Sequence, residues 1–426
     1  MRRQITGLWQ NPDFIKLWVG QAISAFGSHI TWQALPLTAM LLLAASPTEL
    51  GFLAAAGTAP VLVFGLVAGV WVDRLPRRPI MIAADLGRTV LLGSIPLAAI
   101  FGTLTLLQLF VVASLTGLLT VFFDIADQSY LPSLVEHEHI MEGNSKISAS
   151  RSLAEITGQP VGGLLVQLIT APFAIAVDAV SFLVSALCIS LIRKPETRPE
   201  APEQTQPILR EAFEGLRVVF NDPILRVLAF CDIQRTFFGN FIGTLYIIFI
   251  IRELQMPIWV SGVLVGVGGI SSLAGSVVAL RLTRRFGVGK ILIWSAIITS
   301  AITFVIPLAG GPFWLAFTIL VISQAGDAVG TVFFINQTSL RQSVTAEHQL
   351  GRVNASIYFL AGVAGLLGAI ASGVLGDLIG IRTTLLVAVT GYLLAVFWLI
   401  FSPVRKLEQL PERPRPVEQV AGIAPD

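Results

Sequence analysis

The sequence predicts an all-α polytopic membrane protein, with twelve transmembrane helices in two pseudo-symmetric six-helix bundles. Two compositional facts and one repeat lead to this prediction. Of the 426 residues, 54% are hydrophobic and only 13% are charged, whereas a soluble chain carries about 25% charged residues. No soluble core can bury so much apolar surface, so the bilayer must act as the solvent. An internal repeat then divides the chain into two halves.

Twelve stretches are long and apolar enough to cross a bilayer, which takes roughly 20 mostly apolar residues for each helix. We expect spans at residues 14–44, 49–71, 80–102, 105–127, 148–169, 172–192, 225–251, 258–280, 289–309, 313–336, 350–376 and 381–402. The polar stretch between the sixth and seventh spans is rich in Pro, Glu, Gln and Arg, and predicts a linker with a short amphipathic helix at 208–220. The Pro- and Glu-rich chain after residue 403 predicts a disordered tail.

The internal repeat has an offset of about 210 residues. It places Asn11 on Asn221, Pro47 on Pro257, Gly65 on Gly275, Arg74 on Arg284, Phe123 on Phe333, Ser129 on Ser339 and Asn144 on Asn354. Chance matches would not keep one offset over so long a stretch. The repeat predicts two parallel halves with a substrate site between them near the membrane midplane. The expected organisation is an N-terminal bundle at 1–192, a cytoplasmic linker at 193–222, a C-terminal bundle at 223–402 and a cytoplasmic tail at 403–426.

The distribution of Lys and Arg predicts the orientation, because these residues stay on the cytoplasmic side. With both ends of the chain inside, nearly every Lys and Arg lies inside or at an inner helix end. Only Arg252 and Arg382 fall in outer loops. The sequence thus predicts a multi-pass protein of the cytoplasmic membrane, with N- and C-termini in the cytoplasm.

Several function classes are disfavoured. The formal net charge of +2 is too small to suggest a nucleic-acid partner. The chain has no phosphate-binding glycine loop followed by Lys and Ser or Thr, which argues against direct use of ATP. His137 and His139 flank Glu138, but without a second ligand cluster they predict no metal site. The sequence therefore predicts no enzyme, no cofactor and no bound metal.

A dense group of charges follows the second span. Asp73, Arg74, Arg77 and Arg78 lie within six residues, shortly after Gly69. Charge in the hydrocarbon is costly, so this loop belongs at a membrane surface. The glycine lets a neighbouring helix approach closely, and the aspartate can accept hydrogen bonds from arginines or from a helix N-terminus. The simpler interpretation is that the arginines only fix the topology.

This loop resembles the one between helices 2 and 3 of the major facilitator superfamily of transporters. The run from Phe14 to Leu37 resembles the first helix of the drug-exporter branch that includes macrolide efflux proteins and the enterobactin exporter. Tyr130–Val135 with Asn144, and Asp178–Phe182, resemble that branch's loop after helix 4 and its sixth helix. The resemblance implies a major facilitator fold, a monomer, and export of an amphipathic, drug-like molecule by alternating access with proton antiport.

The resemblance also implies roles for two motifs. In the superfamily the acid of the charged loop locks the cytoplasmic side shut, which gives Asp73 a gating role. Many facilitator antiporters have Gly-Pro near the start of a glycine-rich helix 5 motif. Here the order is Gly158-Gln-Pro160-Val-Gly162-Gly163, with the proline one place later, which weakens the support of this motif for antiport.

Ionisable side chains inside the membrane are costly and are functional candidates by default. His29 and Gln33 lie one turn apart on one face of the first span, and histidine titrates near neutral pH. Asp232 and Arg235 share a face of the seventh span. They either pair structurally or couple to protons or substrate.

Asp327 lies deep in the tenth span near Gln324, with no basic residue nearby in the sequence. Because burial disfavours a charged carboxylate, Asp327 is a candidate for carrying a proton. Asp124 and Asp127 share a face toward the inner end of the fourth span. Asp124 and Asp127 are either solvated at the cytoplasmic mouth or take part in coupling to protons or substrate.

Two further groups remain as structural or functional candidates. Arg151 and Glu155, one turn apart at the start of the fifth span, predict an ion pair at the inner surface. Six aromatic residues are candidates for lining an apolar cavity: Trp32, Phe122, Phe123, Phe237, Phe238 and Tyr246. The alternatives to drug export are export of a siderophore or metabolite, import by the same fold, or a non-transporting sensor or scramblase. The complete charged loop and the buried carboxylates favour transport.

Overall fold

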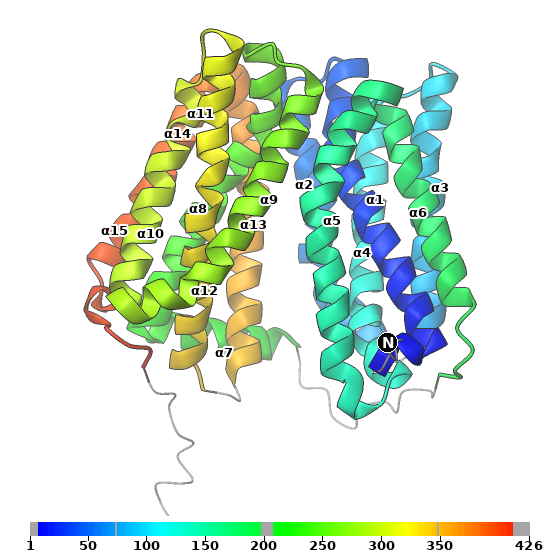
Figure 1. Cartoon of the computed structure of the whole chain (residues 1–426), viewed down its shortest axis with the longest axis horizontal. Coiled ribbons are helices and arrows are strands. Elements are labelled where there is room, and N and C mark those ends of the chain that lie inside the picture. The colour runs from blue at the N-terminus through cyan, green and yellow to red at the C-terminus, as the bar shows by residue number, and fades with distance from the viewer. Residues whose placement is uncertain (1–6, 73–74, 197–207, 347–348, 412–426) are drawn as a thin grey trace, which may run out of the picture. The chain divides into compact units, whose positions relative to one another are not determined.

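The computed structural model describes residues 7–72, 75–196, 208–346 and 349–411, and all the regular elements within these ranges are helical. The chain divides into two units (Figure 1). The first unit holds α1 to α6 together with residues 250–266. The second holds α7, α8 and the helical chain from residue 267 onward.

The helices follow the predicted spans closely. Those before the linker are α1 (Pro12–Leu42), α2 (Pro47–Val72), α3 (Arg77–Ile100), α4 (Leu106–Leu134), α5 (Ile140–Ile169) and α6 (Ala171–Ser190). Those after it are α7 (Ile208–Asn221), α8 (Pro223–Ile248), α9 (Ile258–Phe286), α10 (Val288–Thr303), α11 (Phe313–Ala325), α12 (Asp327–Val344), α13 (Leu350–Ile379), α14 (Ile381–Leu394) and α15 (Val396–Ile400). Each of the twelve predicted spans falls on one or two of these helices, and the predicted amphipathic helix is α7.

Ten stretches within the described residues are long and apolar enough to cross a membrane. The other two predicted spans, α1 and α5, have 31 and 30 residues and are more polar. α5 carries the charged residues Glu142, Lys146, Arg151 and Glu155. These two helices pack against each other, and Trp18 Nε1 of α1 donates to the Ser150 hydroxyl of α5 at 2.7 Å. The chain is an all-α, multi-pass membrane protein.

The start of each unit's first long helix is capped in the same way. The Asn11 side chain accepts hydrogen bonds from two backbone N–H groups of α1, and Pro12 follows it. Asp222 accepts two such bonds from α8, and Pro223 follows it. Side-chain oxygen at the N-cap followed by Pro is a strong start signal. The structural counterpart of Asn11 is therefore Asp222, one residue beyond the sequence match with Asn221.

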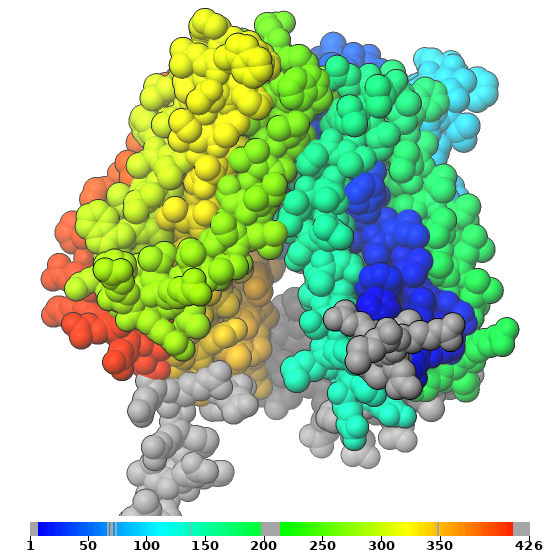
Figure 2. All heavy atoms as spheres, in the orientation of Figure 1, coloured from blue at the N-terminus to red at the C-terminus, as the bar shows by residue number. Residues whose placement is uncertain are grey.

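The two units also pack equivalent helices together, as the repeat predicts. In the first unit α1 packs on α5 and α6, and α3 packs on α4 and α6. In the second unit α8 packs on α13 and α14, and α10 packs on α12 and α14. Figure 2 shows α1 between α5 and α6 on the visible face of the first unit.

The chain after the last helix is ordered at first, so the prediction of disorder from residue 403 is wrong for its beginning. Pro403–Lys406 forms a short 3₁₀ helix in which Val404 is fully buried. The carbonyl oxygens of Leu407 and Glu408 then accept hydrogen bonds from backbone N–H groups at the start of α10, at 2.9 and 3.3 Å. Residues 197–207 of the predicted linker and 412–426 of the predicted tail lie outside the described residues.

Candidate functional site

The tenth predicted span is interrupted in the structure. Gly326 separates α11 from α12, close to the middle of the stretch Phe313–Val344. A Cβ atom at this position would lie 2.6 Å from Cγ2 of Ile302, so glycine allows the close approach of α10. Gly326 itself keeps helical backbone angles (φ −63°, ψ −18°), so α11 and α12 form one span with a local irregularity. Asp327 directly follows this irregularity.

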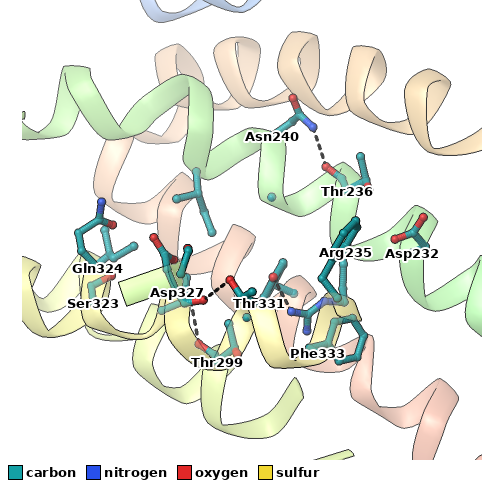
Figure 3. A pocket seen from close by; sticks show the side chains of 18 of the residues that line it. Asp232, Arg235, Thr236, Asn240, Thr299, Ser323, Gln324, Asp327, Thr331 and Phe333 are labelled. Carbon is teal, nitrogen blue, oxygen red and sulfur yellow. Dashed lines mark hydrogen bonds between the residues drawn. The ribbon is translucent and has the colours of Figure 1, made fainter. Parts of the chain in front are cut away.

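A cavity of about 540 Å³ lies in the second unit beside this interruption (Figure 3). Its polar lining residues are Asp232, Arg235, Thr236, Asn240, Ser272, Thr299, Thr303, Ser323, Gln324, Asp327, Thr331 and Gln337. The aromatic lining residues are Phe333, Phe334 and Tyr392. None of the six aromatic residues singled out in the sequence lines this cavity. Charged, hydroxyl, amide and aromatic groups together suit an amphipathic small molecule.

The Asp327 carboxylate has no fixed partner among the side chains that the structure describes. Its Oδ2 atom occupies the space that a Cβ atom at Gly268 of α9 would need, so a glycine on the neighbouring helix makes room for the acid. The Thr331 hydroxyl beside it donates to the backbone carbonyl of Asp327 at 3.0 Å and leaves the carboxylate free (Figure 3). Such a carboxylate can bind a proton or a cation.

Arg235 is held by aromatic side chains. Its Nη2 donates to the Tyr392 hydroxyl at 2.5 Å, and its guanidinium carbon lies 3.9 and 4.4 Å from the ring centroids of Tyr392 and Phe333. The Gln337 amide and the Arg341 guanidinium lie within electrostatic range of Asp232, and Gln337 Nε2 donates to the carbonyl oxygen of Leu228 at 3.5 Å. Figure 3 shows Asp232 and Arg235 pointing apart. Asp232 and Arg235 share a helix face but form no direct ion pair in this structure.

The candidates of the fourth and fifth spans lie in the first unit. The Gln21 amide donates to Asp127 Oδ1, and Arg151 Nη2 lies 3.0 Å from Asp127 Oδ2. The ion pair of Arg151 is thus with α4, not with Glu155 as predicted. Asp127 is buried, whereas Asp124 on the same helix is exposed.

The sequence analysis missed a buried ion pair in α3. Arg88 Nη2 pairs with Asp85, and their side chains are 5% and 0% exposed. The guanidinium also lies 4.4 and 4.1 Å from the ring centroids of Phe123 and Phe182. The seventh span was singled out by an acid and an arginine three residues apart. The third span carries the same pattern in Asp85 and Arg88.

Asp178, which belongs to the run that resembles the branch's sixth helix, lies in the packing contact between α6 and α1. It is 1% exposed and accepts a hydrogen bond from the Ser181 hydroxyl at 2.9 Å. Both side chains occupy the space that a Cβ atom at Gly27 of α1 would need. The contact brings α1 and α6 close together.

The glycine motif of α5 packs that helix closely against α1. A Cβ atom at Gly158 would lie 2.7 Å from the Cβ atom of His29, and one at Gly162 would lie 3.1 Å from the Cα atom of Ile30. His29 is half-buried in this contact. The two glycines, four residues apart, therefore set the distance between the helices.

The other residues of the motif face the start of α9, which belongs to the first unit. A Cβ atom at Gly163 would lie 3.2 Å from the Cα atom of Gly262, and one at Gly262 would lie 3.0 Å from the Cα atom of Pro160. Next to this contact, Gln33 Nε2 donates to the Ser261 hydroxyl at 2.7 Å. Gln33 is 1% exposed, so its amide serves a tight helix contact.

The charged loop is described only in part. Asp73 and Arg74 lie outside the described residues, and Gly69 lies in the last turn of α2. Arg77 and Arg78 begin α3. Their contacts show what the second half of the loop does.

Glu196, which follows α6, caps the start of α3. Its carboxylate accepts hydrogen bonds from the backbone N–H groups of Arg77 and Arg78 at 2.7 and 3.1 Å. The Arg78 guanidinium in turn donates to the carbonyl oxygens of Ile189 and Ser190 at 3.1 and 2.5 Å. These bonds satisfy orphan groups at one helix start and one helix end. They tie α3 to α6 within one unit.

A second tie joins α1 to the same segment. Asp13 accepts hydrogen bonds from Lys16 Nζ at 2.8 Å and from the backbone N–H groups of Arg193 and Lys194 at 3.2 and 3.0 Å. Partial burial alone would raise the pKa of Asp13, but these bonds outweigh it, so its pKa lies below the ordinary value. Lys194 Nζ also donates to the carbonyl oxygen of Leu134 at the end of α4.

Comparison with known proteins places the chain in a family. Its sequence matches the Major Facilitator Superfamily over residues 17–369. The chain belongs to the major facilitator superfamily. It is 29% identical over 370 residues to the multidrug efflux pump Tap of Mycolicibacterium fortuitum, which covers 84% of this chain and 88% of that protein. It is 26% identical over 418 residues to macrolide efflux protein A of Streptococcus pyogenes, which covers 93% and 97%.

Solved structures show the same fold. The nucleoside transporter NupG superposes with a TM-score of 0.74 at 12% identity, over 91% of this chain and 98% of that one. A bacterial homologue of the iron transporter ferroportin superposes with a TM-score of 0.73 at 16% identity, over 93% and 99%. The predicted fold and the resemblance to the drug-exporter branch are confirmed. This superfamily member is a membrane transporter of small molecules and not an enzyme.

Proposed function

We propose that this transporter exports an amphipathic small molecule across the cytoplasmic membrane by alternating access, in exchange for protons. The observation that carries the proposal is the cavity of the second unit, in which Asp327 lies at a helix interruption without a fixed partner. The multidrug and macrolide efflux relatives support the outward direction.

We assign the proton exchange to Asp327 on chemical grounds. A carboxylate without a counter-ion in a cavity inside the membrane holds a proton readily, and it gives that proton up when a cation replaces it. Binding of a cationic substrate and binding of a proton then exclude each other at one group. Asp232 suits this role less, because the positive charges of Arg341 and Arg235 lie near it. His29 lies in the contact with α5, and Asp124 lies in the other unit.

The charged loop keeps its proposed gating role through Asp73. The bonds of Arg77 and Arg78 join the start of α3 to the end of α6 and to Glu196, all within one unit. These two residues therefore position α3 on α6. The basic groups around Lys16 and Lys194 support a cytoplasmic location for this end of the helices. We propose that the protein acts as a monomer with both termini in the cytoplasm.

The test is transport by the purified protein in liposomes that enclose a pH-sensitive dye. A proton gradient is imposed, and a panel of lipophilic cations, macrolides and siderophores is added. We expect substrate-dependent proton movement that Asp327→Asn abolishes and that the matched variant Asp232→Asn retains. Movement that survives Asp327→Asn but fails with Asp232→Asn or His29→Ala would move the coupling site. Substrate flux without proton movement would refute antiport, and the absence of any flux would favour a sensor.

A further inference from the structure

Arg235 carries an unused hydrogen-bond donor in the cavity wall. The residue is 7% exposed, and its Nη1 atom is buried without a hydrogen-bond partner among the described residues. Nη2 is already bonded to Tyr392. A buried donor on a charged group is costly when unsatisfied, so a ligand acceptor that reaches Nη1 after a small side-chain movement would lower the free energy of the site.

The surroundings of Arg235 hold the guanidinium in one plane. The Phe333 and Tyr392 rings lie within 4.4 Å of its central carbon. They provide cation–π contacts, but neither ring offers an acceptor in the guanidinium plane to Nη1. A fixed, planar guanidinium is suited to bind a carboxylate and orient it.

The charges of the cavity point to the same chemistry. Asp232, Arg235 and Asp327 are the ionisable acids and bases in its lining. Asp232 lies within electrostatic range of Arg341 and Arg235, whereas Asp327 has no ion-pair partner among the described residues and Arg235 keeps one open donor. Figure 3 shows these two residues at separate places along the cavity. One suits an anionic group of a ligand and the other a cationic group.

We propose that Arg235 binds a carboxylate of the transported molecule, so that the transporter prefers amphoteric substrates with a cationic amine and an acidic group. The inference rests on the proposed function, because it takes the cavity as the substrate site. Arg235 is then the residue that determines specificity, and Asp327 receives the cationic end.

Two rhodamine dyes test the inference directly. They share one xanthylium cation and differ only in that one has a free carboxylate and the other its methyl ester. Fluorescence polarisation with the full chain in detergent measures both dissociation constants near pH 7.5, where the acid is ionised. We expect the free acid to bind wild type about tenfold more tightly than the ester, as one charge-assisted hydrogen bond provides.

Variants then assign the preference to Arg235. In Arg235→Gln the dissociation constant of the free acid should rise about tenfold while that of the ester stays unchanged. Arg235→Lys, which keeps the charge without the planar group, should retain part of the preference. The matched control is Arg341→Gln, because Arg341 is a buried arginine of the same unit that does not line the cavity. It should keep the full preference. Thermal melting of each variant confirms folding.

Three results would overturn the inference: equal binding of acid and ester to wild type, a preference that survives in Arg235→Gln, or binding of neither dye. The proposed function fails separately. Asp327→Asn should weaken both dyes alike and abolish proton movement in liposomes. Intact proton coupling with no preference for the acid refutes the role of Arg235 alone. A preference for the acid without proton coupling refutes antiport alone.

Discussion

The two units differ in how their membrane-embedded charges are partnered. In the first unit Asp85 is paired with Arg88, and Asp127 is bonded to Gln21 and Arg151. In the second unit two charged residues of the cavity lining lack a full set of partners among the described residues: the Asp327 carboxylate has no ion-pair partner, and Arg235 has an open donor. These first-unit charges are satisfied within the protein, while these two second-unit charges are open to a ligand.

The repeat shows where the difference arises. With the offset of 210 residues, Asp327 corresponds to Gly117 in the first unit, and Gly268 corresponds to Thr58. A Cβ atom at Gly117 would collide with the carbonyl oxygen of Gly57, whereas Asp327 lies against Gly268. A glycine that allows close helix packing in the first unit is therefore replaced by an acid in the second.

At a second equivalent contact, the amide and the carboxylate exchange helices between the two units. In the first unit Gln21 of α1 donates to Asp127 of α4. In the second unit the acid is Asp232 of α8 and the amide is Gln337 of α12, whose Nε2 donates to the carbonyl oxygen of Leu228 of α8 at 3.5 Å. An amide and a carboxylate therefore occupy the equivalent contact between the first and fourth spans in both units. This equivalence supports a structural role for Asp232.

The largest expected effect comes from removing the arginine of the paired unit. Arg88→Gln leaves the Asp85 charge buried and uncompensated, which should cost about 3–5 kcal/mol of stability. Arg235→Gln breaks no direct ion pair and should cost about 1 kcal/mol through lost cation–π and hydrogen-bond contacts. Thermal unfolding followed by intrinsic fluorescence in detergent measures both. Equal losses would show that the two units do not differ in this respect.

The smaller expected effect concerns the start of the third span in each unit. Glu196 caps α3 through its side chain, whereas Leu407 and Glu408 cap α10 through backbone carbonyls. Glu196→Ala should therefore lower stability by about 1 kcal/mol, as loss of a helix cap does. Glu408→Ala is the matched control and should change stability by less than about 0.5 kcal/mol. A similar loss in both variants would refute the capping role of the Glu196 side chain.

The sequence was sufficient for features set by local composition. All twelve spans and α7 follow from apolar length and amphipathic spacing, and Asp327 stood out because an isolated acid in an apolar span is costly. The roles of Phe333, Tyr392 and Glu196 escaped prediction, because each depends on contacts between segments far apart in the chain. The close approach of Ile302 of α10 to Gly326 likewise joins separate spans, which the sequence does not show.

The most direct test of the central claim is proton release on substrate binding. The purified protein is placed in a weakly buffered detergent solution with a pH indicator, and the cationic rhodamine ester is added. The account predicts proton release by wild type, none by Asp327→Asn, and wild-type release by Asp178→Asn, a buried carboxylate of the other unit. Release that persists in Asp327→Asn, or that disappears in folded Asp178→Asn, would contradict the assignment of proton exchange to the second unit.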